Sequence, residues 1–378
     1  MRRISTGRGD RGKAAKTIPV TDAVGTVLAH DITEVRKDEF KGRAFRKGHI
    51  IREEDVCHLQ RLGKERLFVL KLEEDEMHED DAAWALAEAL MGEGVEIEGE
   101  PREGKITLLA SRDGLLRVNR EALLDFNLLG DVMCATLHDA TTVRKGEAVA
   151  GTRSIPLVVK RDVICRAQAI GYEAGKVIHV KEMRKPRAGV VITGNEVYFG
   201  KIEDRFAPVI TEKVESFGGE VIGLHYAPDD ESLIENRLKE LLDRGADVLI
   251  TTGGMSVDPD DVTRFAVRRF GAAEIIYGAS VLPGAMILVA YIEKSGRRCR
   301  DSSLKCPHIG PSEVSSMIPV VGIPACAMYS KITVFDLIFP RILSGERIGR
   351  RELAELGHGG LCLKCPVCRH PVCPFGKY

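Results

Sequence analysis

The sequence predicts an α/β protein whose larger domain is a doubly wound, mostly parallel sheet. From Ala188 onward, short apolar runs alternate with amphipathic helical stretches, the order that βαβ units require. Three polar turns follow those runs, and sheets of this kind bind ligands beyond the carboxyl ends of their strands. The chain of 378 residues also leaves room for two or three domains, each with its own core.

Charge and composition exclude several kinds of partner. The net charge of −1 gives no general attraction to nucleic acid or to an anionic membrane. No apolar run approaches the roughly 18 residues that a membrane-spanning helix needs. Residues 1–16 are basic and polar without the apolar core of a secretory signal, so we expect a disordered leader. The ten cysteines form no regular disulfide framework, which favours a reducing cytoplasm.

The first half of the chain is predicted to hold smaller α+β or β-rich domains. Glu53–Leu62 has the apolar spacing of a helix and ends at Gly63, and Leu67–Leu72 follows as a strand. Acidic Glu79–Asp81 would occupy the N-terminus of the next helix, while a metal cluster with His78 is the alternative. The predicted segments are 1–16 (leader), 17–75 (N-terminal segment), 76–180 (small α+β or β-rich domain), 181–348 (α/β domain) and 349–378 (cysteine-rich tail).

Local sequence signals predict each element of the α/β domain. Its strands are short runs of apolar residues, and its helices carry an apolar stripe, as Pro208–Phe217 does before Gly218. The predicted strands are Gly189–Thr193, Val221–Tyr226, Val248–Ile250, Glu274–Tyr277, Met286–Ile292 and Pro319–Gly322. The predicted helices are Pro208–Phe217, Glu231–Arg244, one ending at Phe270, and Tyr329–Leu343. The polar turns at the carboxyl edge are Thr193–Glu196, Thr251–Asp261 and Ile323–Ala327.

The turn in Leu249–Arg264, with the sequence LITTGGMSVDPDDVTR, has the layout of a phosphate-binding loop. Gly253 and Gly254 let backbone N–H groups approach an anion, and a helix is expected to begin near Asp260 or Asp261. The turn lacks the lysine of a nucleotide P-loop. Its aspartates would repel phosphate unless Mg²⁺ lay between them.

Three signatures resemble those of the molybdopterin-binding domain of molybdenum-cofactor biosynthesis proteins. They are TGNE at Thr193–Glu196, TTGGMSVDPDDVT at Thr251–Thr263 and GIPA at Gly322–Ala325. Val24–Asp31 (VGTVLAHD) and the pattern KGHII…LQRLGKERLFV resemble flanking segments of the molybdenum insertase, which transfers molybdenum from molybdate to molybdopterin. The resemblance implies the same doubly wound fold and a molybdopterin substrate.

The resemblance also implies roles for individual residues. The substrate-binding residues would be Thr193, Gly194, Thr252, Gly253, Gly254, Ser256, Thr263 and Pro324. Among these, the glycines and Ser256 would cradle the terminal phosphate of the pterin or the pyrophosphate of its adenylylated form. Glu196 and Asp261 would be catalytic, and Asp204 would hold Mg²⁺ together with Asp261. An N-cap is the alternative role for each acid.

Two stretches depart from the insertase pattern. Insertases carry S-A-M-D-G where this chain has DEFKGRAF, so their catalytic aspartate has no counterpart here. The usual GLPGNPVS is GIPACAMYS, which places Cys326 beside the proposed pocket. Its thiol has two interpretations: a contact with molybdenum or a dithiolene sulfur, or a small buried apolar residue.

The tail carries a second motif, Cys362-x2-Cys365-x2-Cys368-x4-Cys373. Four thiolates at this spacing suit tetrahedral Zn²⁺ or an iron–sulfur cluster, and the spacing does not choose between them.

Three functions fit the sequence. The first is an insertase for molybdenum or tungsten, the second a non-catalytic molybdopterin carrier or sensor, and the third a nucleotide pyrophosphatase. A homodimer is expected by analogy with related insertases, and the tail would dock on another protein of cofactor biosynthesis or on a molybdoenzyme.

Overall fold

The computed structural model describes residues 15–36, 40–70, 72–254, 262–272, 274–293 and 317–377. The chain forms two compact units. The first comprises residues 1–111, 118–137 and 146–179, and the second comprises Arg112–Arg117, His138–Lys145 and residues 180–378. In the described ranges, no helix is long and apolar enough to cross a membrane.

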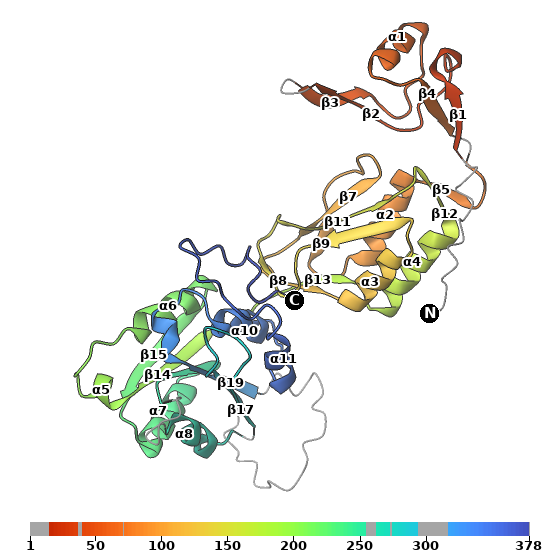
Figure 1. Ribbon diagram of the computed structural model, residues 1–378. Helices are drawn as coiled ribbons and strands as arrows, with labels where there is room; N and C mark the ends of the chain where they lie inside the picture. The colour runs from red at the N-terminus through yellow and green to blue at the C-terminus, as the bar shows by residue number, and fades with distance from the viewer. Residues whose placement is uncertain are drawn as a thin grey trace, which may run out of the picture. The chain divides into compact units, whose positions relative to one another are not determined.

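The N-terminal part of the first unit is built from two antiparallel strand pairs and one helix (Figure 1). Its elements are β1 (Ala15–Pro19), η1 (Val20–Asp22), β2 (Ile32–Arg36), β3 (Phe40–Phe45), α1 (Glu53–Arg61) and β4 (Arg66–Leu70). β1 pairs with β4, and β2 pairs with β3. The predicted disordered leader, residues 1–16, is wrong for its last two residues, which belong to β1. They are ordered because pairing with β4 supplies hydrogen-bond partners for their backbone.

The remainder of the first unit is an α+β domain. Its elements are β5 (Glu76–His78), α2 (Glu79–Leu90), β6 (Val95–Ile97), β7 (Lys105–Ala110), α3 (Arg120–Leu128), β9 (Val132–Thr136), β11 (Ala148–Ser154), β12 (Val158–Lys160) and α4 (Arg161–Glu173). The strands β6, β7, β11 and β9 form an antiparallel sheet in that order. Glu79, Asp80 and Asp81 lie in the first turn of α2, as the capping interpretation predicts. His78 is the N-cap, and its Nδ1 accepts a hydrogen bond from the Asp80 N–H at 3.1 Å. The short strands β8 (Gly114–Val118), β10 (Thr142–Val143) and β13 (Ile178–Lys181) complete the elements before the α/β domain.

The α/β domain contains a six-stranded sheet in the order β15-β14-β16-β19-β18-β17. The strands are β14 (Arg187–Thr193), β15 (Glu220–Ala227), β16 (Val248–Thr252), β17 (Ile275–Tyr277), β18 (Leu288–Glu293) and β19 (Met317–Ile323). The first four strands in the order run parallel, whereas β18 and β17 are antiparallel to their neighbours. The predicted mostly parallel sheet is therefore present with an antiparallel edge.

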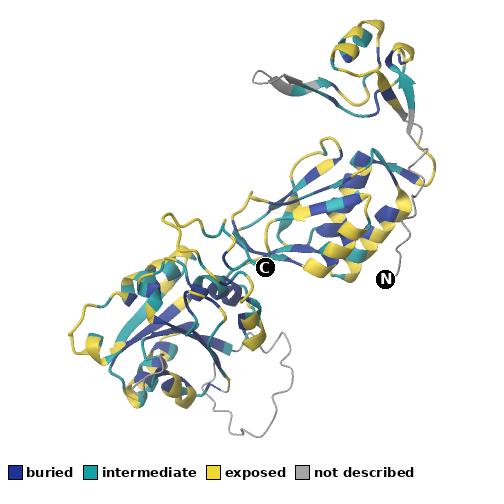
Figure 2. Cartoon of the chain, in the orientation of Figure 1, coloured by how far each residue is buried: buried dark blue, intermediate teal, exposed yellow. Residues whose placement is uncertain are grey.

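Helices cover both faces of this sheet, as the doubly wound prediction requires. They are α6 (Phe206–Ser216), α10 (Val334–Leu343) and α11 (Arg350–Glu355) on one face, and α7 (Glu231–Asp243) and α8 (Thr263–Phe270) on the other. Alternate strand residues face opposite cores: Val190 and Ile192 pack with the first set, Val191 with the second. Figure 2 shows the buried strands between these helices.

The C-terminal region differs from the prediction in two ways. The helix expected over Tyr329–Leu343 begins later, as α10 at Val334, because Thr333 and Asp336 form a capping box there; a separate 3-10 turn, η2 (Ala325–Met328), precedes it. The tail is also anchored in the domain, since Leu353 and Phe375 are buried in its core.

Candidate functional site

The carboxyl ends of the parallel strands meet at one edge of the sheet. The register pairs Thr193 with Ala227, Ile192 with Thr252, and Thr252 with Ile323. The turns that follow β14, β16 and β19 therefore begin side by side, as predicted.

The turn after β16 depends on two glycines with positive φ. Gly253 has φ +75° and Gly254 has φ +55°. A Cβ on Gly253 would lie 2.3 Å from the carbonyl oxygen of Thr193, and one on Gly254 would lie 2.4 Å from Thr263 Oγ1. Any larger side chain would displace the neighbouring strand end or the start of α8.

Buried threonines connect the strand ends to this turn. Thr193 Oγ1 donates to the carbonyl of Thr252 at 2.5 Å and lies 3.1 Å from Thr263 Oγ1. Thr263 Oγ1 in turn donates to the carbonyl of Gly253 at 3.2 Å. The hydroxyls of Thr251 and Thr252 are buried without a hydrogen-bond partner in the described residues. The first and second turns are thus held together by the three threonines predicted to bind substrate.

A cavity of about 590 Å³ opens beside the glycine turn. Its described lining residues are Gly253, Gly254, Leu282, Pro283, Gly284, Ala285, Met286, Pro324, Ala325, Cys326, Leu361, Cys362 and Lys364. The lining is mostly apolar, with Lys364 as the one charged side chain among these residues. The second and third predicted turns therefore share a cavity, which the tail helps to enclose.

The thiol of Cys326 faces an apolar environment with one cation nearby. Burial raises its pKa above the ordinary value, while a hydrogen bond to its own backbone and the ammonium of Lys364 act in the opposite direction. The thiol is therefore mainly protonated at neutral pH until a metal or another electrophile displaces the proton.

The predicted acidic residues lie elsewhere or outside the described ranges. Glu196 is exposed in the first turn of α5 (Asn195–Tyr198). Asp204 accepts hydrogen bonds from the backbone N–H of Phe206 at 2.7 Å and from the hydroxyl of Tyr226 at 3.0 Å, so it caps α6. Neither residue lines the cavity. Ser256 and Asp261 lie outside the described residues, so their predicted roles stay predictions.

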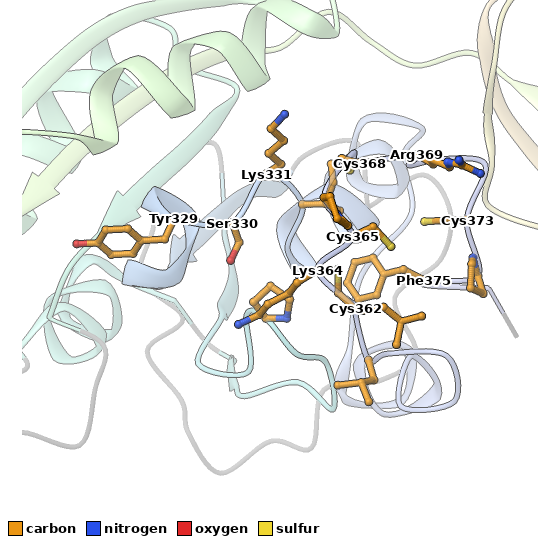
Figure 3. A pocket seen from close by; sticks show the side chains of 16 residues that line it. Tyr329, Ser330, Lys331, Cys362, Lys364, Cys365, Cys368, Arg369, Cys373 and Phe375 are labelled. Atoms are coloured by element: carbon orange, nitrogen blue, oxygen red, sulfur yellow. The ribbon is translucent and has the colours of Figure 1, made fainter.

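The tail cysteines surround a second pocket of about 330 Å³ (Figure 3). Cys362, Cys365, Cys368 and Cys373 all line it, and their thiols are free. In the described part of the chain, however, no three His, Cys, Asp or Glu side chains gather as a metal site. The donor type suits Zn²⁺ or an iron–sulfur cluster, but the four thiols are not assembled around one point.

Sequence reasoning missed the loop between β17 and β18 as part of the site. Leu282–Met286 forms one wall of the cavity, and Gly284, with φ +118°, lies so close to Val334 that a Cβ would be 2.5 Å from Cγ1. The Pro283-Gly284 dipeptide marks a turn in the sequence, but a turn signal alone carries no information about which cavity the turn faces.

Comparison with known families matches two parts of the chain. Residues 189–344 match the family described as "Probable molybdopterin binding domain". Residues 17–71 match a family described as a domain of unknown function.

Curated relatives match only a short stretch. A "CinA-like protein" of Mycobacterium avium (strain 104) is 36% identical over 95 residues, which is 25% of this chain and 22% of that protein. A "CinA-like protein" of Mycobacterium sp. (strain MCS) is 37% identical over 90 residues, or 24% and 21% of the two chains. The chain thus spans about a fifth of the length of these relatives.

Solved structures give more distant likenesses. The tungsten cofactor synthesizing protein MoaB from Pyrococcus furiosus is 18% identical, with a TM-score of 0.33, covering 44% of this chain and all of that one. A molybdopterin biosynthesis protein from Mycobacterium abscessus is 18% identical, with a TM-score of 0.28, covering 43% of this chain and 98% of that one.

Proposed function

We propose that the cavity beside Gly253 and Gly254 binds molybdopterin or its adenylylated form, since residues 189–344, which supply most of its lining, match the family described as "Probable molybdopterin binding domain". The observation that carries the proposal is the position of the glycine turn on the wall of a mostly apolar cavity. The turn offers backbone N–H groups to a phosphate, and the apolar wall covers a ring system.

The size and charge of the cavity support this ligand. Its volume of about 590 Å³ lies within the range of roughly 300–1,000 Å³ that is typical of small-molecule sites. Lys364 supplies a positive charge, and no described residue that lines the cavity is a carboxylate. Among the described residues of this wall, an anionic pterin therefore meets attraction and no fixed negative charge.

For the reaction, we propose transfer of molybdenum or tungsten into the bound pterin, with cleavage of the pyrophosphate of the adenylylated form. We keep Asp261 and Glu196 in the catalytic roles that the resemblance implies, although Glu196 is not among the described residues that line the cavity. Mg²⁺, when bound, neutralises phosphate charge, and Asp261 is the residue we assign to it. The Asp204 carboxylate already accepts hydrogen bonds from the N-terminus of α6, so we do not propose it as a second Mg²⁺ ligand.

A non-catalytic carrier or sensor is the second candidate. It is favoured by the lack of a carboxylate among the described cavity residues and by the DEFKGRAF stretch, which lacks the insertase aspartate. A nucleotide pyrophosphatase is the third candidate, and the same assay separates it from the other two.

The test is an anaerobic assay of the full chain with adenylylated molybdopterin, Mg²⁺ and molybdate or tungstate. AMP release together with metal incorporation supports the insertase. Tight pterin binding without either supports the carrier, and pyrophosphate cleavage of free dinucleotides without pterin binding supports the pyrophosphatase. Asp261→Ala should abolish turnover and leave the fold intact; turnover in that variant with unchanged pterin affinity contradicts the assignment.

The cytoplasmic location stays a prediction, and the tail metal and the dimer are predictions with tests of their own. Elemental analysis of the purified chain reports zinc or iron in the tail, and light scattering after size exclusion reports the oligomeric state. A dimer would matter for the site because related insertases can combine residues of both chains.

A further inference from the structure

The pocket around the tail cysteines is cationic as well as apolar. Its described lining includes three charged side chains, Lys331, Lys364 and Arg369, and no carboxylate. All three are exposed, and none forms an ion pair within the described residues. Figure 3 shows them on different sides of the pocket rather than gathered at one point. The pocket therefore attracts an anion that carries its charges at several positions.

Large apolar side chains lie exposed among these cations. Tyr329, Leu361 and Leu363 line the pocket and are 76%, 65% and 73% exposed. Val367 and Val372, which adjoin lining residues of the tail in the sequence, are 71% and 89% exposed. Single exposed apolar residues are common on protein surfaces, but several in and beside one pocket mark a surface that contacts another molecule.

The tail that carries these side chains is held in place. Phe375 is buried in the core of the α/β domain. The N–H of Leu282 donates to the carbonyl of Gly360 at 2.8 Å, and the N–H of Cys362 donates to the carbonyl of Leu282 at 2.8 Å. The exposed apolar side chains therefore belong to an ordered surface, and a preformed surface loses little conformational entropy when a partner binds.

Charge and side-chain chemistry favour a protein segment over other occupants. Single-stranded nucleic acid binds where aromatic faces stack on its bases, whereas the exposed side chains of the tail are aliphatic. Anionic membranes are recognised by clusters of about four to eight basic residues, more than the three that line this pocket. A protein segment with carboxylates spaced among apolar side chains matches both the spread of the cations and the apolar surface between them.

We propose that this surface is a docking site for an acidic segment of another protein that also carries apolar side chains. The residues of the docking site are Tyr329, Lys331, Leu361, Leu363, Lys364 and Arg369. The carboxylates of the segment pair with the three cations, and its apolar side chains cover the exposed leucines. The apolar contact supplies most of the affinity, because exposed ion pairs contribute little and act mainly on orientation and on the rate of association. The inference goes beyond the pterin site and gives the chemistry of the partner expected for the tail.

The test is fluorescence anisotropy of the full chain with a fluorescein-labelled peptide in which glutamate alternates with leucine. We expect binding that weakens as the salt concentration rises. Lys331→Glu combined with Arg369→Glu should weaken it by about tenfold or more, because two exposed ion pairs are lost and like charges face each other. Leu363→Ser should also weaken it. The matched control, Lys239→Glu with Arg268→Glu, makes the same charge change at exposed residues of α7 and α8 and should bind as the wild type does.

Three results overturn the proposal. They are failure of the glutamate–leucine peptide to bind, an equal loss of affinity in the control variant, and equal or tighter binding of a lysine–leucine peptide, single-stranded RNA or anionic vesicles. Lys331, Leu363 and Arg369 do not line the cavity assigned to the pterin, so their variants should keep the wild-type affinity for molybdopterin. Failure of peptide binding therefore leaves the pterin assignment untouched, and failure of pterin binding leaves the peptide result standing.

Discussion

Replacing Gly253 with alanine tests whether the glycine turn is shaped for a ligand. Two effects add in this variant. An L-residue at φ +75° destabilises the folded state by roughly 1–2 kcal/mol, and the lower entropy of the unfolded chain partly offsets this loss. The new methyl would also lie 2.3 Å from the carbonyl of Thr193, and overpacking of a buried contact costs roughly 1–3 kcal/mol.

Gly345→Ala is the matched control. Gly345 has φ +86° in the same unit, but beyond its chain neighbours no heavy atom of the described residues lies within 4 Å of its would-be Cβ. Gly345→Ala therefore introduces the same kind of backbone strain as Gly253→Ala, but no close contact of the new methyl group. Urea unfolding should therefore show a loss of about 1 kcal/mol for Gly345→Ala and a further loss of about 1–3 kcal/mol for Gly253→Ala.

Ligand binding separates the two variants further. Displacement of the turn misaligns an N–H group that donates to phosphate, and a hydrogen bond to a charged group is worth roughly 1.5–3 kcal/mol. Molybdopterin affinity, measured anaerobically by fluorescence titration, should fall by about 10- to 150-fold in Gly253→Ala and stay unchanged in Gly345→Ala. Equal stability and equal affinity in the two variants would refute the reasoning.

Three further predictions follow from other contacts. Thr263→Val removes the hydroxyl that joins Thr193 to the carbonyl of Gly253 and should lower the free energy of unfolding by about 1–3 kcal/mol, whereas Thr263→Ser should retain it. Asp204→Asn should keep both stability and turnover because asparagine caps a helix as well as aspartate does; lost turnover in a stable variant would show that the carboxylate does more than cap. Burial raises the pKa of Cys134 to about 12 from the ordinary 9.0, so the unfolded state loses this proton first and stability falls as pH rises from about 9 toward 12, by up to roughly 1.4 kcal/mol per pH unit. Unfolding curves of Cys134→Ala should show a shallower decline over that range, and identical slopes would contradict the assignment.

The parallel core of the α/β domain could be predicted because its signals are local. The apolar run Val248–Ile250 followed by two glycines predicts a buried strand and a turn, and β16 lies at Val248–Thr252. The predicted strand Val221–Tyr226 and helix Glu231–Arg244 likewise agree with β15 and α7 to within a residue or so at each end.

The antiparallel edge could not be predicted in this way. Residues 278–287, between β17 and β18, contain no helix, so these strands are joined by a loop rather than by the crossover that parallel strands need. Strand direction depends on that connection and on the neighbour chosen, neither of which appears in the apolar pattern of Met286–Ile292.

The candidate site was predicted where it rests on the glycine turn and not where it depends on distant segments. Gly253, Gly254 and Pro324 line the cavity as the motifs suggest. The wall formed by Leu282 and Cys362 follows from a bridge between Leu282 and Leu361, a contact between segments far apart in sequence. The tail was expected to be a separate metal-binding piece, and no spacing of cysteines predicts that it packs against this loop.

The most direct test of the account is hydrogen–deuterium exchange of the full chain with and without molybdopterin, under anaerobic conditions. The account predicts slower exchange in the four segments that line the cavity, which are residues 253–254, 282–286, 324–326 and 361–364. It predicts no change in α2 and β11 of the first unit. Unaltered exchange at the cavity, with protection confined to other segments, would contradict the assignment of this cavity to the pterin.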